Sequence, residues 1–302
     1  MKTNGFKPGV PVHSYEKGAD GRVLFYCLRD RLVYFTIFCI EAVRHDIVVL
    51  ALCLMFNHIH SLTKTPSYEK HFRFHQSVES QYAMAFNEAS CRNGRVFKKP
   101  FKWALKRSVK KVKDCLAYHA NNPVVKKLCK KGVENQWTFL AYGASDHPFS
   151  DPIVWSKASA AFRRGVKLVN AAHYNEKPLG FAQLDIIYHS LGPDEVRQMT
   201  DYIIKTYSVI DFEKAAAYFG GYEKMIAAFD IISGSEYDIS EDFIPEPDVP
   251  YLEMIRVVQK LGYDLSKKRF LSLDGAEKTA LVELLLKATN ASPLQVSRFL
   301  HL

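Results

Sequence analysis

The sequence predicts an α+β fold, with a small antiparallel sheet and packed helices at the N-terminal end and a mainly α-helical C-terminal region. Two observations indicate this fold. Over the first ~140 residues, segments of strand character alternate with longer segments of helical periodicity. Beyond residue 150 the periodic segments are almost all helical. The chain of 302 residues, 48% hydrophobic and 24% charged, has the composition of a soluble globular protein and suffices to bury a core.

The strand predictions depend on apolar patterning. Val10–Tyr15 alternates in polarity and precedes a turn at Gly18–Gly21. Ile47–Leu54 is apolar throughout and starts with three β-branched residues, which predicts a strand buried on both faces. His58–Thr63 continues that strand or pairs beside it. Arg95–Lys106 is expected to be extended and basic.

Three helices are expected between these segments, packed on one side of the sheet. Arg29–Asp46 has a strongly apolar face. Tyr68–Ala89 follows the helix-start signals in Thr65–Ser67. Val109–Asn121 is the third helix, and we expect Pro123 to end it because the residue before a proline is pushed out of the αR region.

The second half is expected to be helical, apart from one acidic stretch. Ser235–Glu253 holds seven acidic residues, three prolines and no Lys or Arg, which predicts an exposed linker. The predicted helices are Ile153–Ala172, Gly192–Ser208, Asp211–Ala217, Tyr222–Ile232, Pro250–Leu261 and Gly275–Thr289.

We divide the chain into three predicted units, residues 1–145, 146–250 and 251–302, with the best boundary at Gly143–Pro152. In the last unit, Glu277–Ala288 and Pro293–Leu300 resemble the first two helices of a helix-turn-helix, with Ser292 as the cap of the second. Either Pro293–Leu300 contacts DNA itself or the recognition helix is absent. A two-helix hairpin that packs on the helical half is an equal alternative.

Composition excludes several classes of protein. No segment approaches the ~20 apolar residues of a membrane helix, and Met1–Gly9 lacks the apolar core of a secretion signal. The six cysteines include no C-x-x-C pair, which argues against a zinc ribbon and a disulfide scaffold. We therefore expect a cytoplasmic protein with reduced thiols.

The formal charge of +9 is concentrated in one segment. Arg92–Lys131 holds fourteen Lys or Arg and one acid, a local balance of +13, so the remaining residues sum to −4. Such concentrated charge suits nucleic acid, and interleaved aromatic rings can stack unpaired bases. A solvated lysine-rich face is the alternative. The candidate nucleic-acid-binding residues are Lys98, Lys99, Phe101, Lys102, Trp103, Lys106, Arg107, Lys110 and Lys111.

A histidine pair follows the apolar segment Ile47–Met55. Only Ile59 separates His58 from His60, and strand side chains alternate with a period of two, so both imidazoles lie on one face. Ile59 is then expected to point into a core. Because neutral imidazoles bind divalent metals, this pair supplies half of a metal site.

A tyrosine and an asparagine form a second pattern further along the chain. Tyr118 and Asn122 lie four residues apart on the third predicted helix, so both project from one face. A tyrosine beside a metal site can attack a phosphodiester with its phenolic oxygen. His119 faces roughly 100° away and is expected at the surface or against DNA, whereas Asn57 is expected to support the histidine strand. Four histidines carry no spacing argument and are expected to be structural: His13, His45, His71 and His75.

Together, Met55–His60 and Tyr118–Val124 resemble the HUH single-strand tyrosine transposases, and in particular their REP-associated branch. Val12–Gly18, Tyr82–Asn87 and Gly94–Phe101 resemble the family's opening strand, second helix end and basic hairpin in the same order. The resemblance covers about residues 9–143. Singly, each pattern has a plainer explanation in packing or helix capping, so the catalytic interpretation depends on their occurring together.

The resemblance implies an activity for the chain. His58 and His60 would hold Mg²⁺ or Mn²⁺ with Asn122 as third ligand, and Tyr118 would cleave single-stranded DNA beside a hairpin, leaving a 5′-phosphotyrosine and a free 3′-hydroxyl. The enzyme would act at the nucleoid, as a monomer or as a homodimer that exchanges the tyrosine helix.

Two other functions stay open. The leading alternative is a domesticated, non-catalytic protein that binds single-stranded DNA or RNA hairpins. A metal-dependent nuclease that activates water is the other, and the motif region offers it no paired carboxylates as general base.

Overall fold

A four-stranded antiparallel sheet lies at the centre of the N-terminal half. The computed structural model describes residues 5–232, 234, 236, 238, 239 and 246–302. The strands are β1 (Val12–Lys17), β2 (Val48–Leu54), β3 (His58–Lys64) and β4 (Lys102–Leu105), in the order β2-β3-β1-β4. β1 therefore pairs with both β3 and β4, and its register places Tyr15 opposite His60. The α+β prediction is confirmed.

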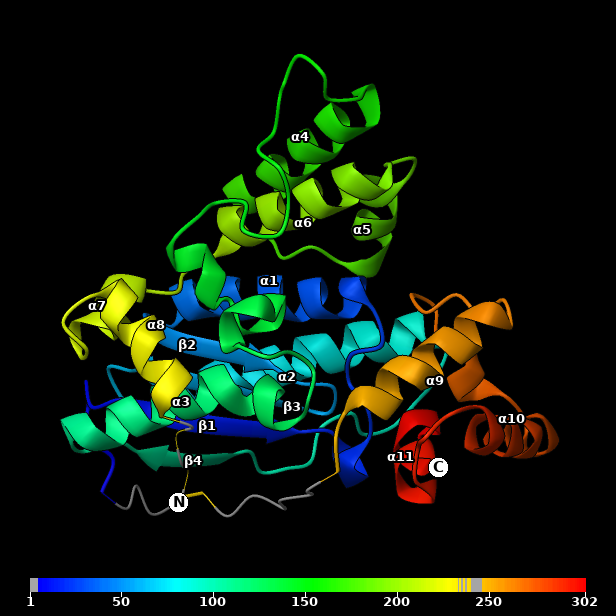
Figure 1. The fold of residues 1–302 in the computed structure, drawn as a ribbon, viewed down its shortest axis with the longest axis horizontal. Coiled ribbons are helices and arrows are strands. Elements are labelled where there is room, and N and C mark those ends of the chain that lie inside the picture. Colours follow the sequence, from blue (N-terminus) through cyan, green and yellow to red (C-terminus); the bar gives the residue numbers. More distant parts are fainter. Residues whose placement is uncertain (1–4, 233, 235, 237, 240–245) are drawn as a thin grey trace.

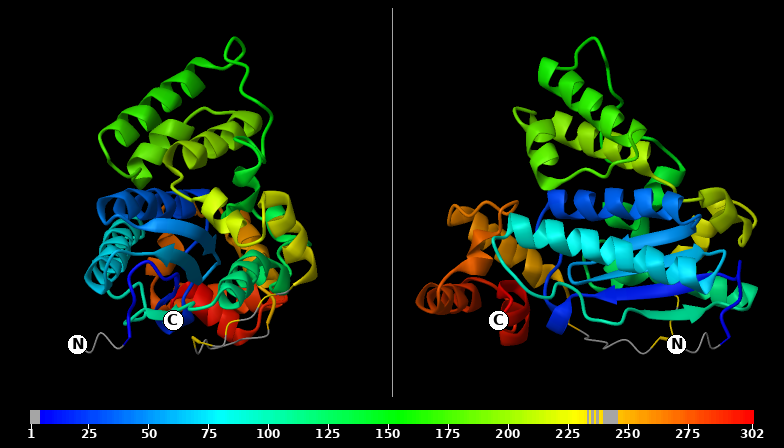
Figure 2. Two further views of the ribbon diagram at one scale, coloured as in Figure 1. Left: turned by 90° about the vertical axis from the view of Figure 1, so that its left-hand side faces the viewer. Right: turned by 180° about the vertical axis from the view of Figure 1, so that it is seen from behind.

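Helices cover both faces of this sheet, not one as predicted. α1 (Leu28–Arg44) and α2 (Tyr68–Ala89) lie on one face, and α3 (Val109–Val125) lies on the other with α7 and α8 (Figures 1 and 2). Leu50 and Leu62 pack in the core under α3, whereas Ile59 packs in the core under α1 and α2. Strands that are apolar on both faces need a cover on each, which explains the second layer.

Helix α3 continues past the proline that was expected to end it. Pro123 lies in the last helical turn, and the helix closes with hydrogen bonds from Lys126 N to Asn122 O (3.1 Å) and from Leu128 N to Pro123 O (2.9 Å). Packing outweighs the local preference, because Asn121 Nδ2 donates to two carbonyl oxygens at the C-terminal end of α8 (Tyr222–Ile231). These are the oxygens of Phe229 and Ile232, at 2.9 Å each. Asn122 consequently stays in helical register with Tyr118.

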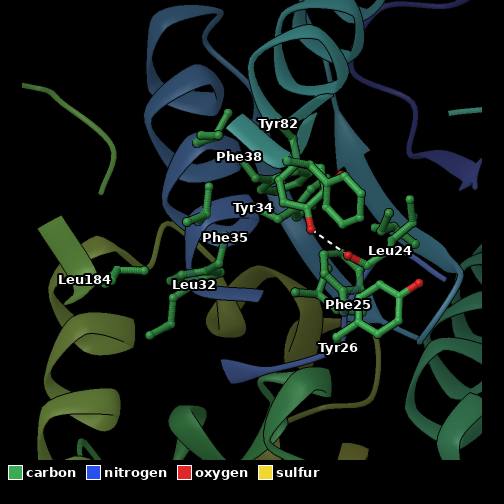
Figure 3. Close-up of a cluster of buried hydrophobic side chains, with 14 of the residues drawn as sticks. Leu24, Phe25, Tyr26, Leu32, Tyr34, Phe35, Phe38, Tyr82 and Leu184 are labelled. Atoms are coloured by element: carbon green, nitrogen blue, oxygen red, sulfur yellow. Dashed lines mark hydrogen bonds between the residues drawn. The ribbon is translucent and has the colours of Figure 1, made fainter. Parts of the chain in front are cut away.

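Aromatic side chains fill the core between α1, α2 and the segment before α1. Figure 3 shows Phe25, Tyr34 and Phe38 packed together beside Tyr82, whose hydroxyl donates to Leu24 O at 2.7 Å. The hydroxyl is thus satisfied inside an apolar cluster, as a buried polar group must be.

The second half is helical, as predicted, with one helix that the sequence did not reveal. That helix is α5 (Phe181–Tyr188), and α4 begins only where Ser159 caps it, later than expected. α5 and α6 pack against the outer side of α1, and α4 packs on α5 and α6. α9 to α11 gather at one end of the sheet (Figure 1). The other helices are α4 (Ala160–Tyr174), α6 (Pro193–Tyr207), α7 (Phe212–Ala217), α8 (Tyr222–Ile231), α9 (Val249–Lys260), α10 (Gly275–Ala288) and α11 (Pro293–Leu300). Short 3₁₀ turns are Ala19–Gly21, Gly132–Glu134, Gln136–Thr138, Leu140–Gly143 and Arg269–Ser272.

The C-terminal helix pair packs against the N-terminal half. Tyr26 Oη donates to Phe299 O at 2.6 Å, and the ring of Phe299 stacks on Phe270 with 5.5 Å between centroids. His301 Nε2 lies 2.8 Å from Val23 O. These contacts bury one side of α11. A DNA-reading helix also packs one side on its own domain, so both interpretations of this helix pair stay predictions.

Part of the acidic stretch Ser235–Glu253 lies outside the described residues. For the part that is described, the prediction of an exposed linker is wrong. The side chain of Glu236 is 1% exposed, and Ile239 and Asp248 are buried. Helix α9 already starts at Val249. All six cysteines carry free thiols. Within the described part of the chain, no helix has both the length and the apolarity to cross a membrane.

Candidate functional site

The histidine pair lies on one face of β3, as its spacing predicts. The imidazole rings of His58 and His60 are 4.9 Å apart between centroids. Ile59 points to the opposite face and is 1% exposed in the core. The two rings face α3, so they are buried between sheet and helix instead of lying open on the strand.

Helix α3 brings Tyr118 and Asn122 to these histidines. Asn122 Nδ2 lies 3.1 Å from His60 Nε2, and the ring of Tyr118 lies 5.3 Å from the ring of His60. Tyr118 is half-buried and Asn122 is buried. Four residues from two distant segments thus form one cluster, which is the arrangement that the two sequence patterns require.

Hydrogen bonds on the far side of each imidazole define its tautomer. His58 Nδ1 lies 2.7 Å from Asn57 Oδ1, so it carries the proton and donates, and Asn57 Nδ2 in turn donates to Gly21 O at 3.0 Å. His60 Nδ1 lies 3.1 Å from His13 Nε2. The other ring nitrogen of His60, Nε2, lies on the side of Asn122. Asn57 supports the histidine strand, as expected.

Burial keeps these histidines neutral. It lowers the pKa of His58 to about 3, with the nearby Lys126 charge acting in the same direction. Burial also holds the pKa of His60 well below its ordinary value. Neutral imidazoles are the form that binds metal, and the amide of Asn122 offers an oxygen after a half-turn of its side chain. The donor set fits Mn²⁺ better than Mg²⁺, which prefers oxygen ligands alone.

Two histidines that the sequence did not assign to the site also belong to this cluster. His119 is 2% exposed, so the surface position expected for it is wrong. Its ring lies 4.7 Å from that of His13 and 5.5 Å from that of His60, and its Nδ1 donates to Cys115 O at 2.6 Å. Neighbouring positions on a helix that lies flat on a sheet can both face the sheet, which explains its burial.

These side chains offer a wider set of metal-binding atoms than the predicted triad. Ligand atoms of His13, His60 and His119 all lie within 4.8 Å of one another, as do those of His13, Cys115 and Glu236. The alternation of β1 could have indicated that His13 shares a face with Tyr15. Its position beside His60 depends on the strand register, which no local pattern gives.

The candidate nucleic-acid-binding residues divide by exposure. Phe101 is buried with its ring 4.5 Å from that of His75, and Lys106 is 3% exposed and paired with Glu236 and Asp238. Both contact protein groups instead of solvent. The others remain accessible: Lys98, Lys99, Arg107, Lys110 and Lys111 are exposed, and Lys102 and Trp103 are half-buried.

Comparisons with known proteins give one distant likeness. No family model matches the chain, and no curated protein matches it. A solved structure of a REP-associated tyrosine transposase bound to a REP hairpin is similar over 45% of this chain and 80% of that one, with 14% sequence identity and a TM-score of 0.39. The likeness concerns the fold alone.

Proposed function

We propose that this protein is a metal-dependent single-stranded DNA endonuclease and strand transferase of the HUH tyrosine kind, which cleaves beside hairpins. The observation that supports it best is the meeting of His58, His60, Tyr118 and Asn122 in one half-buried cluster, with Asn122 Nδ2 3.1 Å from His60 Nε2. Pure binding of nucleic acid needs none of these four side chains.

In this proposal His58 and His60 would hold the metal through Nε2, and Asn122 would hold it through its amide oxygen. A bound Mn²⁺ or Mg²⁺ would supply Lewis-acid polarisation of the scissile phosphate. Asn57 and His13 contact the two imidazoles at Nδ1, which leaves Nε2 of each ring as the nitrogen that would face the metal.

Tyr118 performs the covalent step. Its Oη forms a bond to phosphorus and loses its proton to solvent, while the bond from phosphorus to the 3′-oxygen breaks and that oxygen gains a proton. The products are a 5′-phosphotyrosine and a free 3′-hydroxyl. Attack by another 3′-hydroxyl reverses the step, so no oxidant, reductant or nucleotide is needed.

The surface around the cluster suits a polyanion. Lys98, Lys99 and Arg107 lie exposed on the connections that flank β4, and Lys110 and Lys111 lie exposed in the first turn of α3. Five cations on adjacent segments would contact phosphates and make binding salt-dependent. Half-buried Trp103 is the aromatic residue of this group best placed to stack a base.

A covalent-adduct assay tests the proposal. Wild-type protein with Mn²⁺ and 3′-labelled hairpin oligonucleotides from the DNA flanking its own gene should give labelled protein on a denaturing gel. Tyr118→Phe and His58→Ala should each abolish the label. Tyr174→Phe is the matched control and should keep it, since Tyr174 is 88% exposed on α4.

The second candidate is a non-catalytic binder of single-stranded DNA or RNA hairpins. The five exposed cations around β4 and the start of α3 favour it, because contacts between lysine or arginine and phosphate need no metal. Equal hairpin affinity of wild-type and Tyr118→Phe protein, with no adduct across Mn²⁺, Mg²⁺ and several hairpins, would replace the catalytic proposal by this one.

A further inference from the structure

A continuous chain of hydrogen bonds extends from the proposed metal site to the acidic stretch. The Glu236 carboxylate can only accept, so His13 Nδ1 carries a proton and donates to Glu236 Oε2. His13 Nε2 is then the acceptor for His60 Nδ1 at 3.1 Å, which leaves His60 Nε2 unprotonated beside Asn122 Nδ2. Every donor in this chain faces an acceptor, and every link points in the same direction.

Glu236 is built into the fold at the end of this chain. Its carboxylate accepts hydrogen bonds from Lys106 Nζ at 2.7 and 2.6 Å and from the backbone N–H groups of Asp238 (2.8 Å) and Ile239 (3.1 Å). Burial raises the pKa of this carboxyl, but the hydrogen bonds from His13 and Lys106, together with the charge of Lys106, outweigh burial and hold the pKa well below its usual range. Glu236 is thus a buried, charged carboxylate with all its acceptor positions in use.

Gly234, two positions before Glu236, lies against helix α3. Gly234 has a φ of +73°, and a Cβ there would lie 2.1 Å from Tyr118 N. The chain therefore lies directly on the backbone of α3 at Tyr118. One turn further along α3, Asn121 holds the end of α8 through the carbonyl oxygens of Phe229 and Ile232. These contacts bring residue 236 to the buried face of β1.

We infer that Glu236 is a positioning residue for the metal site: through His13 it holds His60 in the tautomer that presents Nε2 to the metal. The inference deepens the proposed function and rests on it for the identity of the ligands. Asn57 does the same for His58 through a single hydrogen bond. A carboxylate behind a ligating histidine also raises the basicity of the ligand, and loss of such a partner typically weakens metal binding by 10–100-fold.

Two measurements on the full chain test this inference without DNA. In metal-free protein, ¹⁵N NMR of the imidazoles should show His60 with a protonated Nδ1 and an unprotonated Nε2. In Glu236→Ala the two tautomers should mix. Titration with Mn²⁺, followed by the EPR signal of the free ion, should give a Kd raised ~10–100-fold in the same variant.

Asp238→Ala is the matched control. Asp238 lies in the same stretch and pairs with the same lysine, Lys106 Nζ at 3.0 Å, but the structure gives it no bond to His13 among the described residues. The Asp238→Ala variant should keep the wild-type tautomer of His60. Its Kd for Mn²⁺ should stay within ~3-fold of the wild-type value, which is a smaller change than the one expected when a ligating histidine loses its hydrogen-bond partner. His13→Phe keeps a ring of similar volume and removes the acceptor, so it should reproduce both effects even if Glu236→Ala does not fold.

The outcomes separate the inference from the proposed function. A wild-type tautomer and wild-type Mn²⁺ affinity in folded Glu236→Ala or His13→Phe protein would overturn the inference, whatever the adduct assay shows. Shifted tautomers and weaker Mn²⁺ binding, in a protein that never forms an adduct, would support the positioning role and refute the nuclease activity.

Discussion

Strand β1 carries two buried histidine–glutamate pairs, one on each face of the sheet, and the two differ in charge. His13 pairs with Glu236 on the face toward α3, and Glu16 pairs with His75 on the face toward α1 and α2. The side chains of His13 and Glu16 point to opposite faces of the sheet, because side chains alternate along a strand and these two positions are three residues apart.

The lysine beside one pair accounts for the difference. Lys106 contacts Glu236, whose pKa stays low in spite of burial. Glu16 instead accepts a hydrogen bond from Tyr34 Oη at 2.8 Å, and burial raises its pKa to about 8. At neutral pH the first pair holds a carboxylate and the second a protonated acid. A buried carboxyl ionises only where a cation or enough donors compensate its desolvation. The same two types of side chain therefore form a charged contact behind His60 on one face and a neutral packing contact on the other.

Removing the lysine should produce the largest effect. Lys106→Met leaves Glu236 buried without its cation, and breaking a buried ion pair typically costs ~3–5 kcal/mol in the free energy of unfolding. Urea unfolding followed by circular dichroism measures it. Lys110→Met, at an exposed position on α3, should change stability by less than ~0.5 kcal/mol. Equal stabilities of the two variants would show that the lysine does not distinguish the pairs.

Displacing the stretch that carries Glu236 should have the next largest effect. Gly234→Ala adds a Cβ against the Tyr118 backbone at a φ of +73°, and we expect a loss of ~2–3 kcal/mol. Gly9→Ala has the same φ of +73° with nothing within 4 Å, so it should lose only ~1 kcal/mol. Mn²⁺ affinity should fall in the first variant alone. If Mn²⁺ affinity fell in both variants, the affinity would not depend specifically on the position of Glu236.

The neutral pair, Glu16 and His75, should make the stability of the protein depend on pH. Folded Glu16 has a pKa of about 8 against an ordinary 4.5, so between these values the folded state binds more protons than the unfolded state. The free energy of unfolding should therefore fall as pH rises through this window. Glu16→Gln imitates the protonated acid and should flatten the dependence.

Stability of Glu16→Gln near pH 5 should stay close to wild type, since both then carry a neutral group at this position. Glu79 lies nearby with a pKa also raised to about 8, so Glu79→Gln should remove a further part of the slope. If the free energy of unfolding kept its wild-type dependence on pH in both variants, Glu16 would not be the protonated acid of the two pairs.

Local periodicity determined those parts of the molecule that depend on backbone geometry within one element. The period of two put His58 and His60 on one face, and the separation of four put Tyr118 and Asn122 on one side of α3. The bounds of α2 and α11 also agree with their start and cap signals. Backbone dihedral angles alone fix such relations, so a single sequence can show them. The division into three units and the roles of the site residues stay predictions.

Only the tertiary structure decided which partners stand behind those histidines. His13 reaches His60 because β1 pairs with β3 in one antiparallel register. Glu236 reaches His13 across 223 residues of sequence, by a path that depends on the packing of Gly234 on α3. Strand register, the second helical layer and the helical continuation at Pro123 all arise from packing between distant segments. The free energy of this packing outweighs local preferences of about 1 kcal/mol per residue. No local sequence pattern could therefore predict these features.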